Sequence, residues 1–402
     1  MTSSAGRLFC KPTKWHGRNG YVLGNSLVRL ITLTGGGHIA EFQLEQSPGV
    51  NPLWLPPWKT IEPQSYHEKV HKPRYGTITE GKLLSGIVGH NICLDYFGSP
   101  SAEESQVGLS QHGEAASSLW RKLAIDHGAE LIALKLSVQL PVAGLRFTRK
   151  IELRKEESVA YITEVVENRR KADHFFHWTQ HVTLGPEFLV PGEASISLPG
   201  TRGITDPTGY EGATPLLNAN EEFSWPHAPS LSGERVDLRS PFIRKGCGFV
   251  VGVLLDKTKE IGFVTAVNRK LGLLIAYCFR REDFPWVAIW EENRGIAAPP
   301  WNGETQARGL EFSTTPLPML RRDSFLAGRL FGEATLTWVP ARASRTVRYL
   351  ALLGHVPRDF DAVHDVTVND RAIHVQGSGG QQLTIPSSAR SHLSKQLLNS
   401  PQ

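Results

Sequence analysis

The feature that most constrains the fold is the length of the apolar runs, which are short and alternate with polar residues. A first example is Leu-Val-Arg-Leu-Ile-Thr-Leu at 27–33, which is closed by the glycines at 35–37. Alternation at period two places successive side chains on opposite faces of an extended strand, and glycines permit the tight turn that follows. We therefore expect β-strands joined by turns.

The same pattern continues through the chain. Three consecutive segments that alternate at period two predict an antiparallel meander over residues 131–138, 145–153 and 159–166. After an irregular stretch, three further runs predict more strands over residues 247–254, 262–267 and 273–279. Helical periodicity is limited to 323–331 and 387–398, and the absence of alternating strands and helices excludes a doubly wound sheet.

The composition excludes several classes of protein. A formal charge of +5 over 402 residues is small, and basic and acidic residues are interleaved, so we expect no nucleic-acid partner. The four cysteines lie far apart, which predicts buried free thiols rather than a disulfide framework or a zinc cluster. We find no signal peptide and no run of about 18 apolar residues, so we expect no membrane partner and a cytoplasmic protein.

We divide the chain into three parts. Residues 1–20 form an N-terminal extension, residues 21–356 a single β domain, and residues 357–402 a C-terminal β extension with a polar tail. The length suffices to bury a large core without disulfides, and the sequence leaves the oligomeric state open.

The densest group of candidate side chains is the segment from His174 to His181. His177 and His181 lie four residues apart and share a face in a strand or a helix. They could bind a metal together with a distant third ligand, but the HExxH pattern is absent, and we expect no metal and no cofactor. The alternative for His174 and His177 is an ordinary hydrogen-bonded role within a strand.

Two further segments carry polar rings beside turn glycines. His112 precedes Gly113 and is followed by Trp120, while His90 follows Gly89. Such positions present side chains at the end of a strand. His90 and His112 could donate hydrogen bonds to sugar hydroxyls, and Trp120 could offer an apolar face to a sugar ring or belong to the core.

A carboxylate within an apolar strand is the most suggestive single residue. Glu311 lies in Gly-Leu-Glu-Phe, downstream of a strand that places Trp286 and Trp290 on one face. Burial would raise the pKa of such a carboxyl toward the range of a general base, whereas a surface glutamate would stay ordinary. The two tryptophans could stack on a sugar ring or simply fill the core.

In their order along the chain, these segments resemble the aldose 1-epimerase family and the wider galactose mutarotase-like superfamily. The resemblance rests on His112-Gly113 followed by a tryptophan, on the strand that carries His181, and on the late Gly-x-Glu strand at Glu311. It implies an all-β fold, a large antiparallel β-supersandwich, over roughly residues 20–355. It also implies that His181 is the general acid, Glu311 the general base and His112 a sugar-binding histidine.

The chain departs from the family at several motifs. The family's Asn-His-x-Tyr-Phe-Asn-Leu stretch is replaced by residues 179–185, its Gly-Arg-x-x-Asn-Arg stretch has only Gly89-His90-Asn91 as a counterpart, and its sugar-binding aspartate has no match. We therefore expect a divergent member, an isomerase that interconverts the anomers of a small sugar. The alternatives are a carbohydrate-binding protein without catalysis and a polysaccharide lyase or hydrolase.

Overall fold

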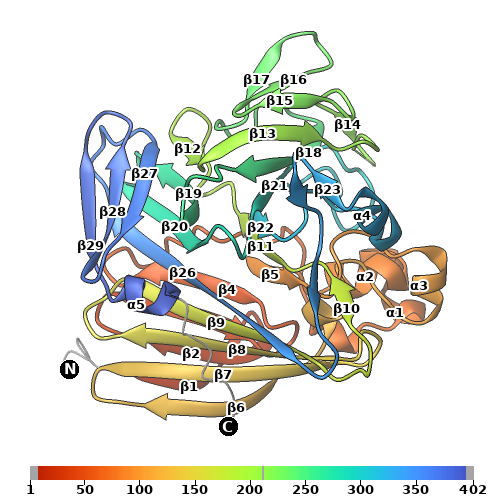
Figure 1. Cartoon of the computed structure of the whole chain (residues 1–402), viewed down its shortest axis with the longest axis horizontal. Coiled ribbons are helices and arrows are strands. Elements are labelled where there is room, and N and C mark those ends of the chain that lie inside the picture. The colour runs from red at the N-terminus through yellow and green to blue at the C-terminus, as the bar shows by residue number, and fades with distance from the viewer. Residues whose placement is uncertain (1–7, 211, 395–402) are drawn as a thin grey trace.

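The computed structural model describes residues 8–210 and 212–394 and is built on two large sheets packed face to face (Figure 1). The first contains twelve of the described strands, and all its pairings are antiparallel except β14 with β18. Its strands, in spatial order with β14 last, are β1 (Phe9–Trp15), β2 (Arg18–Gly24), β3 (Val28–Leu33), β4 (Ile39–Leu44), β5 (His90–Cys93), β11 (Thr179–Leu184), β22 (Gln306–Ser313), β21 (Trp286–Asn293), β18 (Cys247–Leu255), β13 (Gly200–Thr205), β15 (Glu222–Ser224) and β14 (Thr214–Pro215).

The second sheet contains eight of the described strands and confirms the predicted meander, which forms β9, β8 and β7 side by side. Its strands, in spatial order, are β12 (Ala194–Ser197), β19 (Ile261–Asn268), β20 (Leu273–Arg280), β26 (Ser344–His355), β9 (Val159–Asn168), β8 (Leu145–Arg154), β7 (Leu131–Leu140) and β6 (Arg121–His127). Alternate side chains of both sheets meet in one continuous apolar core.

A small third sheet and a short helix cover the outer face of β26, β20 and β19. They are β27 (Val363–Val368), β28 (Ala372–Gly377), β29 (Gln382–Pro386) and α5 (Ala389–Leu393). Residues such as Ile373, Val375 and Leu352 form a second core between the layers. The predicted C-terminal extension is thus packed against the large sandwich as far as Ser394, and the last residues of its tail lie outside the described ones.

The remaining elements are short. Three two-stranded pairs are formed by β10 (His174–Phe176) with β25 (Thr337–Val339), β16 (His227–Pro229) with β17 (Arg235–Asp237), and β23 (Arg329–Leu330) with β24 (Glu333–Ala334). The other helices are α1 (Glu68–Tyr75), α2 (Ile78–Leu84), α3 (Ala102–Gln106), α4 (Arg321–Ala327) and the 3₁₀ turns η1 (Pro63–Ser65) and η2 (Ala115–Ser117).

Helices α1, α2 and α3 gather at one end of the molecule, next to β10 and α4 (Figure 1). The sequence analysis predicted a helix over 323–331, which starts two residues later than α4 and ends four residues beyond it, and it did not predict α1, α2 or α3. These helices are five to eight residues long, and α1 contains Pro73, so they lack the repeated apolar spacing that identifies a helix in a sequence.

A small polar network is buried within the apolar core between the two large sheets. Arg149 Nε lies 2.6 Å from Glu164 Oε1, and both side chains are fully buried. Glu164 also accepts hydrogen bonds from Gln180 on the first sheet, from Trp178 just before β11, and from Tyr349 on the second sheet. The network therefore ties β11 to β8, β9 and β26, where it satisfies polar groups that the core would otherwise leave unpaired.

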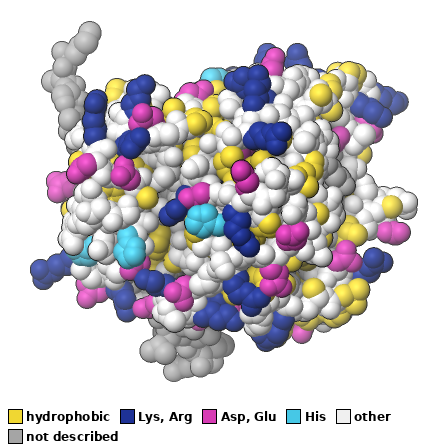
Figure 2. Space-filling model, turned by 90° about the horizontal axis from the view of Figure 1, so that it is seen from above, with side chains coloured by type: hydrophobic (Ala, Val, Ile, Leu, Met, Phe, Trp, Pro, Cys, Tyr) yellow, Lys and Arg dark blue, Asp and Glu magenta, His cyan; other side chains and the backbone are white. Residues whose placement is uncertain are grey.

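The expected all-β supersandwich is confirmed. The predicted N-terminal extension supplies β1 and the start of β2 at the edge of the first sheet, and residues 1–7 lie outside the described ones. All four cysteines are buried and free, as predicted. None of the helices in the described part of the chain has the length and apolar character needed to cross a membrane. Basic and acidic side chains are interspersed over the face shown in Figure 2.

Candidate active site

Strand register brings His181 and Glu311 together on one face of the first sheet. His181 on β11 is paired with Glu311 on β22 and, on its other side, with Asn91 on β5. Residues that face each other across antiparallel strands point to the same side of the sheet. Asn91, His181 and Glu311 therefore form a row across three strands, on the face turned away from the core between the sheets.

The two titratable side chains are in contact. His181 Nε2 lies 3.3 Å from Glu311 Oε1, and His181 Nδ1 lies 3.0 Å from the hydroxyl of Thr183. Glu311 Oε1 has no aligned hydrogen-bond partner, and neither does the amide of Asn91. The row thus holds an imidazole whose two nitrogens face Thr183 and Glu311, together with a carboxyl oxygen and an amide that have no aligned partner.

Burial sets the protonation of this pair. His181 is only 5% exposed and Glu311 1%, so loss of solvation penalises the charged form of each. Burial lowers the pKa of His181 to about 4 and raises the pKa of Glu311 well above its ordinary value. Burial accordingly favours the uncharged form of each group, a protonated carboxyl beside a neutral imidazole.

His112 and Trp290 lie against His181. The ring centroids are 5.3 Å apart for His112 and His181, and 6.1 Å apart for His181 and Trp290. The amide of Gly98 donates to His112 Nδ1, and burial holds the pKa of His112 well below its ordinary value. The neutral ring therefore carries its hydrogen on Nε2 and can act as a donor.

The structure does not bring the other predicted residues to this group. His90 points to the opposite face of the sheet, where its ring bonds to Gln180 and packs against Tyr277. Trp120 belongs to the core between the sheets and donates to the carbonyl of Ala115. Trp286 shares the face of Glu311, but its indole is fully buried and donates to the carbonyl of Ala334.

No family model and no curated protein matches the sequence of the chain, whereas solved structures match its fold. A candidate aldose 1-epimerase from Klebsiella pneumoniae superposes with a TM-score of 0.59 at 13% identity, covering 87% of this chain and 83% of that one. A galactose mutarotase-like protein from Clostridium acetobutylicum gives 0.58 at 11% identity, covering 87% and 99%.

A third structure, a candidate mutarotase from Salmonella typhimurium, gives a TM-score of 0.55 at 11% identity and covers 86% of this chain and 94% of that one. The chain has the galactose mutarotase-like fold. The resemblance seen in its short motifs is thus confirmed for the fold, and at this identity the likeness extends no further than the fold.

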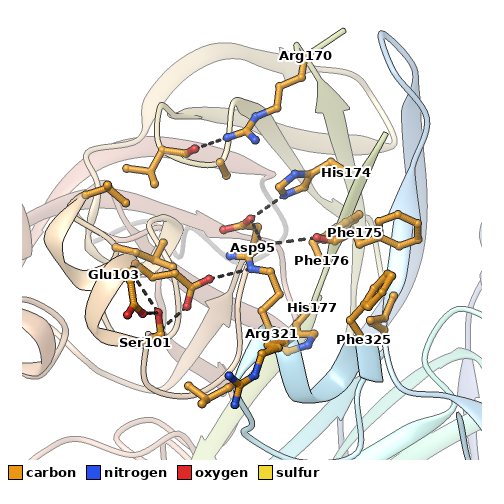
Figure 3. Close-up of a pocket in the computed structure, with 18 residues that line it drawn as sticks. Asp95, Ser101, Glu103, Arg170, His174, Phe175, Phe176, His177, Arg321 and Phe325 are labelled. Carbon is orange, nitrogen blue, oxygen red and sulfur yellow. Dashed lines mark hydrogen bonds and ion pairs between the residues drawn. The ribbon is translucent and has the colours of Figure 1, made fainter. Parts of the chain in front are cut away.

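This version of the mutarotase-like fold also contains a pocket of about 770 Å³ between α3, β10 and α4 (Figure 3). Its base carries Asp95, which lies 2.7 Å from His174 Nε2 and 2.8 Å from Arg321. Burial alone would raise the pKa of Asp95, but the hydrogen bond from His174 and the charge of Arg321 lower it below its usual range. His177 lines the same pocket, whereas His181 and Glu311 do not.

His177 and His181 have separate neighbours. His177 Nδ1 accepts from the amide of Phe97, and its ring stacks on Tyr96, while His181 contacts Thr183 and Glu311. Across residues 8–210 and 212–394, no three His, Cys, Asp or Glu side chains are grouped so as to hold a metal ion.

The sequence analysis missed three residues of the site: Asn91, Thr183, and Gly309, whose lack of a side chain leaves room for the Glu311 carboxyl. Asn91 was noted only as a fragment of a degraded motif, because its place beside His181 depends on pairing between strands about 90 residues apart. The signal for Gly309 was present in the Gly-x-Glu spacing, since residues two apart on a strand share a face.

Proposed function

We propose that the chain is a mutarotase-like aldose 1-epimerase that interconverts the anomers of a small sugar through His181 and Glu311. The observation that carries this proposal is the 3.3 Å contact between His181 Nε2 and Glu311 Oε1, on neighbouring strands of a fold that the chain shares with mutarotase-like proteins. Asn91, His112 and Trp290 are the candidate groups for holding the sugar.

The reaction needs one proton donor and one proton acceptor. A base removes the proton of the anomeric hydroxyl while an acid protonates the ring oxygen, so the bond between the anomeric carbon and the ring oxygen breaks and an open-chain aldehyde forms. The aldehyde group then rotates, and the ring hydroxyl attacks its other face. This closure returns the hydroxyl proton to the catalytic pair and restores a proton to the anomeric oxygen. The acid and base exchange protonation states in opening and recover them in closing, so a pair that holds a single proton is sufficient.

Burial favours the state in which Glu311 holds that proton and His181 is the free acceptor. The family assignment, with His181 as acid and Glu311 as base, describes the other tautomer, which is reached by one proton transfer across the 3.3 Å contact. Both tautomers contain the same number of protons and predict the same bell-shaped pH profile. Activity falls at low pH when the pair gains a second proton, near the His181 pKa of about 4, and at high pH when Glu311 ionises.

Exchange NMR of the anomers of glucose and galactose tests this function. We expect Glu311→Gln and His181→Asn each to reduce the enzymatic rate by about a hundredfold or more, because each removes one half of the acid–base pair. Matched controls are Glu304→Gln and His127→Asn, which make the same chemical changes at exposed positions and should leave the rate unchanged. Unchanged rates in the Glu311 and His181 variants would refute the proposal.

A non-catalytic carbohydrate-binding protein is the second candidate, favoured by the near-complete burial of His181 and Glu311. Such a protein would bind sugar in calorimetry while anomer exchange stayed at the spontaneous rate. Rate enhancement by the unmodified chain excludes it.

A further inference from the structure

We propose that the pocket between α3, β10 and α4 is a binding site for an uncharged sugar unit, separate from the His181–Glu311 pair. None of the residues that line it belongs to the row on β5, β11 and β22. The inference does not depend on the proposed epimerase activity.

Two buried polar atoms of residues that line the pocket lack hydrogen-bond partners among the described residues. They are Oδ1 of Asp95 and Nε2 of His177, and both side chains are about 1% exposed. Because His177 Nδ1 accepts from the amide of Phe97, the hydrogen of the neutral ring lies on Nε2. The lining thus contains one unpaired acceptor and one unpaired donor, which is the complement of hydroxyl groups, since a hydroxyl can both donate and accept.

The rim of the pocket is aromatic. Phe175 and Phe325 line it, are 42% and 59% exposed, and meet edge to face with ring centroids 5.7 Å apart. Trp338, on the strand paired with β10, extends this surface at 6.4 Å from Phe175. In Figure 3 the two phenylalanines stand beside the polar group of Asp95, His174 and Arg321. Flat apolar rings around a few convergent polar groups suit a sugar ring, which has apolar faces and polar edges.

The charges of the lining are balanced, which distinguishes this pocket from an anion site. Three basic and three acidic side chains line it: Arg170, Arg321, Arg322, Asp95, Glu103 and Glu104. Arg321 is paired with Asp95 at 2.8 Å and with Glu104 at 3.1 Å, so its charge is already neutralised. An uncharged ligand fits this balance better than a phosphate or a carboxylate, which would bind Arg321 only in competition with Asp95 and Glu104.

The experiment uses methyl β-D-glucopyranoside and methyl β-D-galactopyranoside, which cannot be anomerised because the anomeric hydroxyl is blocked. Their affinities are measured by NMR titration of the whole chain. We expect Phe175→Ala and Phe325→Ala each to weaken the binding of at least one glycoside about tenfold, and the ring ¹⁵N signals of His177 to shift on binding. The matched control is Leu326→Ala, since Leu326 is exposed on the same helix but does not line the pocket.

Several results would overturn the site. They are no binding of either glycoside, unchanged affinity in both phenylalanine variants, no shift of the His177 signals, or tighter binding of D-glucuronate than of the glucoside. Anomer exchange is measured in parallel on the unmodified chain. Binding of a glycoside without anomer exchange would support the pocket as a sugar site and refute the epimerase proposal. Anomer exchange without binding in the pocket would support the epimerase and refute the pocket.

Discussion

At the scale of single residues, the glycine two positions before Glu311 explains how a carboxyl can lie flat against its own strand. A Cβ atom on Gly309 would lie 2.1 Å from Glu311 Oε1, so only glycine leaves room for the carboxyl in its present position. The atom that would have to move is the end of a flexible side chain rather than backbone. An added methyl group would therefore disturb the position of the carboxyl more than the fold.

We predict that Gly309→Ala yields a folded protein whose anomer-exchange rate is about ten- to a hundredfold lower. A displacement of about 1 Å in a reacting group is enough for a loss of that size. Exchange NMR measures the rate of anomer exchange, and circular dichroism shows whether the variant is folded. Gly128→Ala serves as the control because Gly128 lies in an exposed turn, where the nearest neighbouring atom is 3.3 Å from the added carbon. An unaltered rate in Gly309→Ala would contradict this account of the site.

At the same scale, the sequence predicted His181 and Glu311 but not Asn91 or the face of His90. The first two stand in short motifs whose order survives in this chain. The side of the sheet on which His90 and Asn91 lie is decided by the register of β5 against β11, and a shift of one residue would exchange them. Pairing of this kind is set by tertiary structure and leaves no local signal.

At the scale of elements, β11 is held from behind by the buried Arg149–Glu164 network. We predict that Arg149→Met lowers the free energy of unfolding by about 3–5 kcal/mol, because it leaves the Glu164 carboxylate buried without its cation. Urea denaturation measures the change. Arg146→Met on the same strand is the control, since Arg146 pairs with Glu167 at the surface and its loss costs about 1 kcal/mol or less. Similar losses in the two variants would show that the network is not a main support of β11.

The long strands were predictable and the short helices were not. Alternation over eight to ten residues marks β7, β8 and β9 clearly, because one face of each strand is buried throughout. Helices α1 and α2 bury only a few side chains at the end of the sandwich, and α3 buries none and begins with a capping box of Ser101 and Glu104, so none of them shows an amphipathic pattern of its own. The residues around the pocket, Asp95 and Arg321 among them, come from segments about 225 residues apart and could not be grouped from the sequence.

At the scale of the whole molecule, several buried histidines make the fold sensitive to acid. Burial lowers the pKa of His38 and His177 to about 3 and that of His181 and His392 to about 4. In the unfolded chain these rings protonate near pH 6.5, so the unfolded state binds more protons as the pH falls from 6.5 toward 4. Glu311 has the opposite sign, because its raised pKa favours the folded state at low pH and this contribution is lost as the pH rises.

We predict that the histidines outweigh the glutamates whose pKa burial raises, Glu114 and Glu291 as well as Glu311, and that the melting temperature falls steeply between pH 6.5 and pH 4. Each histidine contributes about 1.4 kcal/mol per pH unit over that range. Calorimetry across this range, combined with a measurement of proton uptake on unfolding, tests the prediction. A constant melting temperature, or unfolding without proton uptake below pH 6, would contradict it.

The row of Asn91, His181 and Glu311 is fixed by the register of three strands, while residues 94–120 supply His112 and one wall of the pocket. This division makes the protein a suitable starting point for directed evolution. A library that varies residues 99–109 would reshape one wall of the pocket without touching the strands that hold the row. The pocket wall and the row can therefore be altered one at a time.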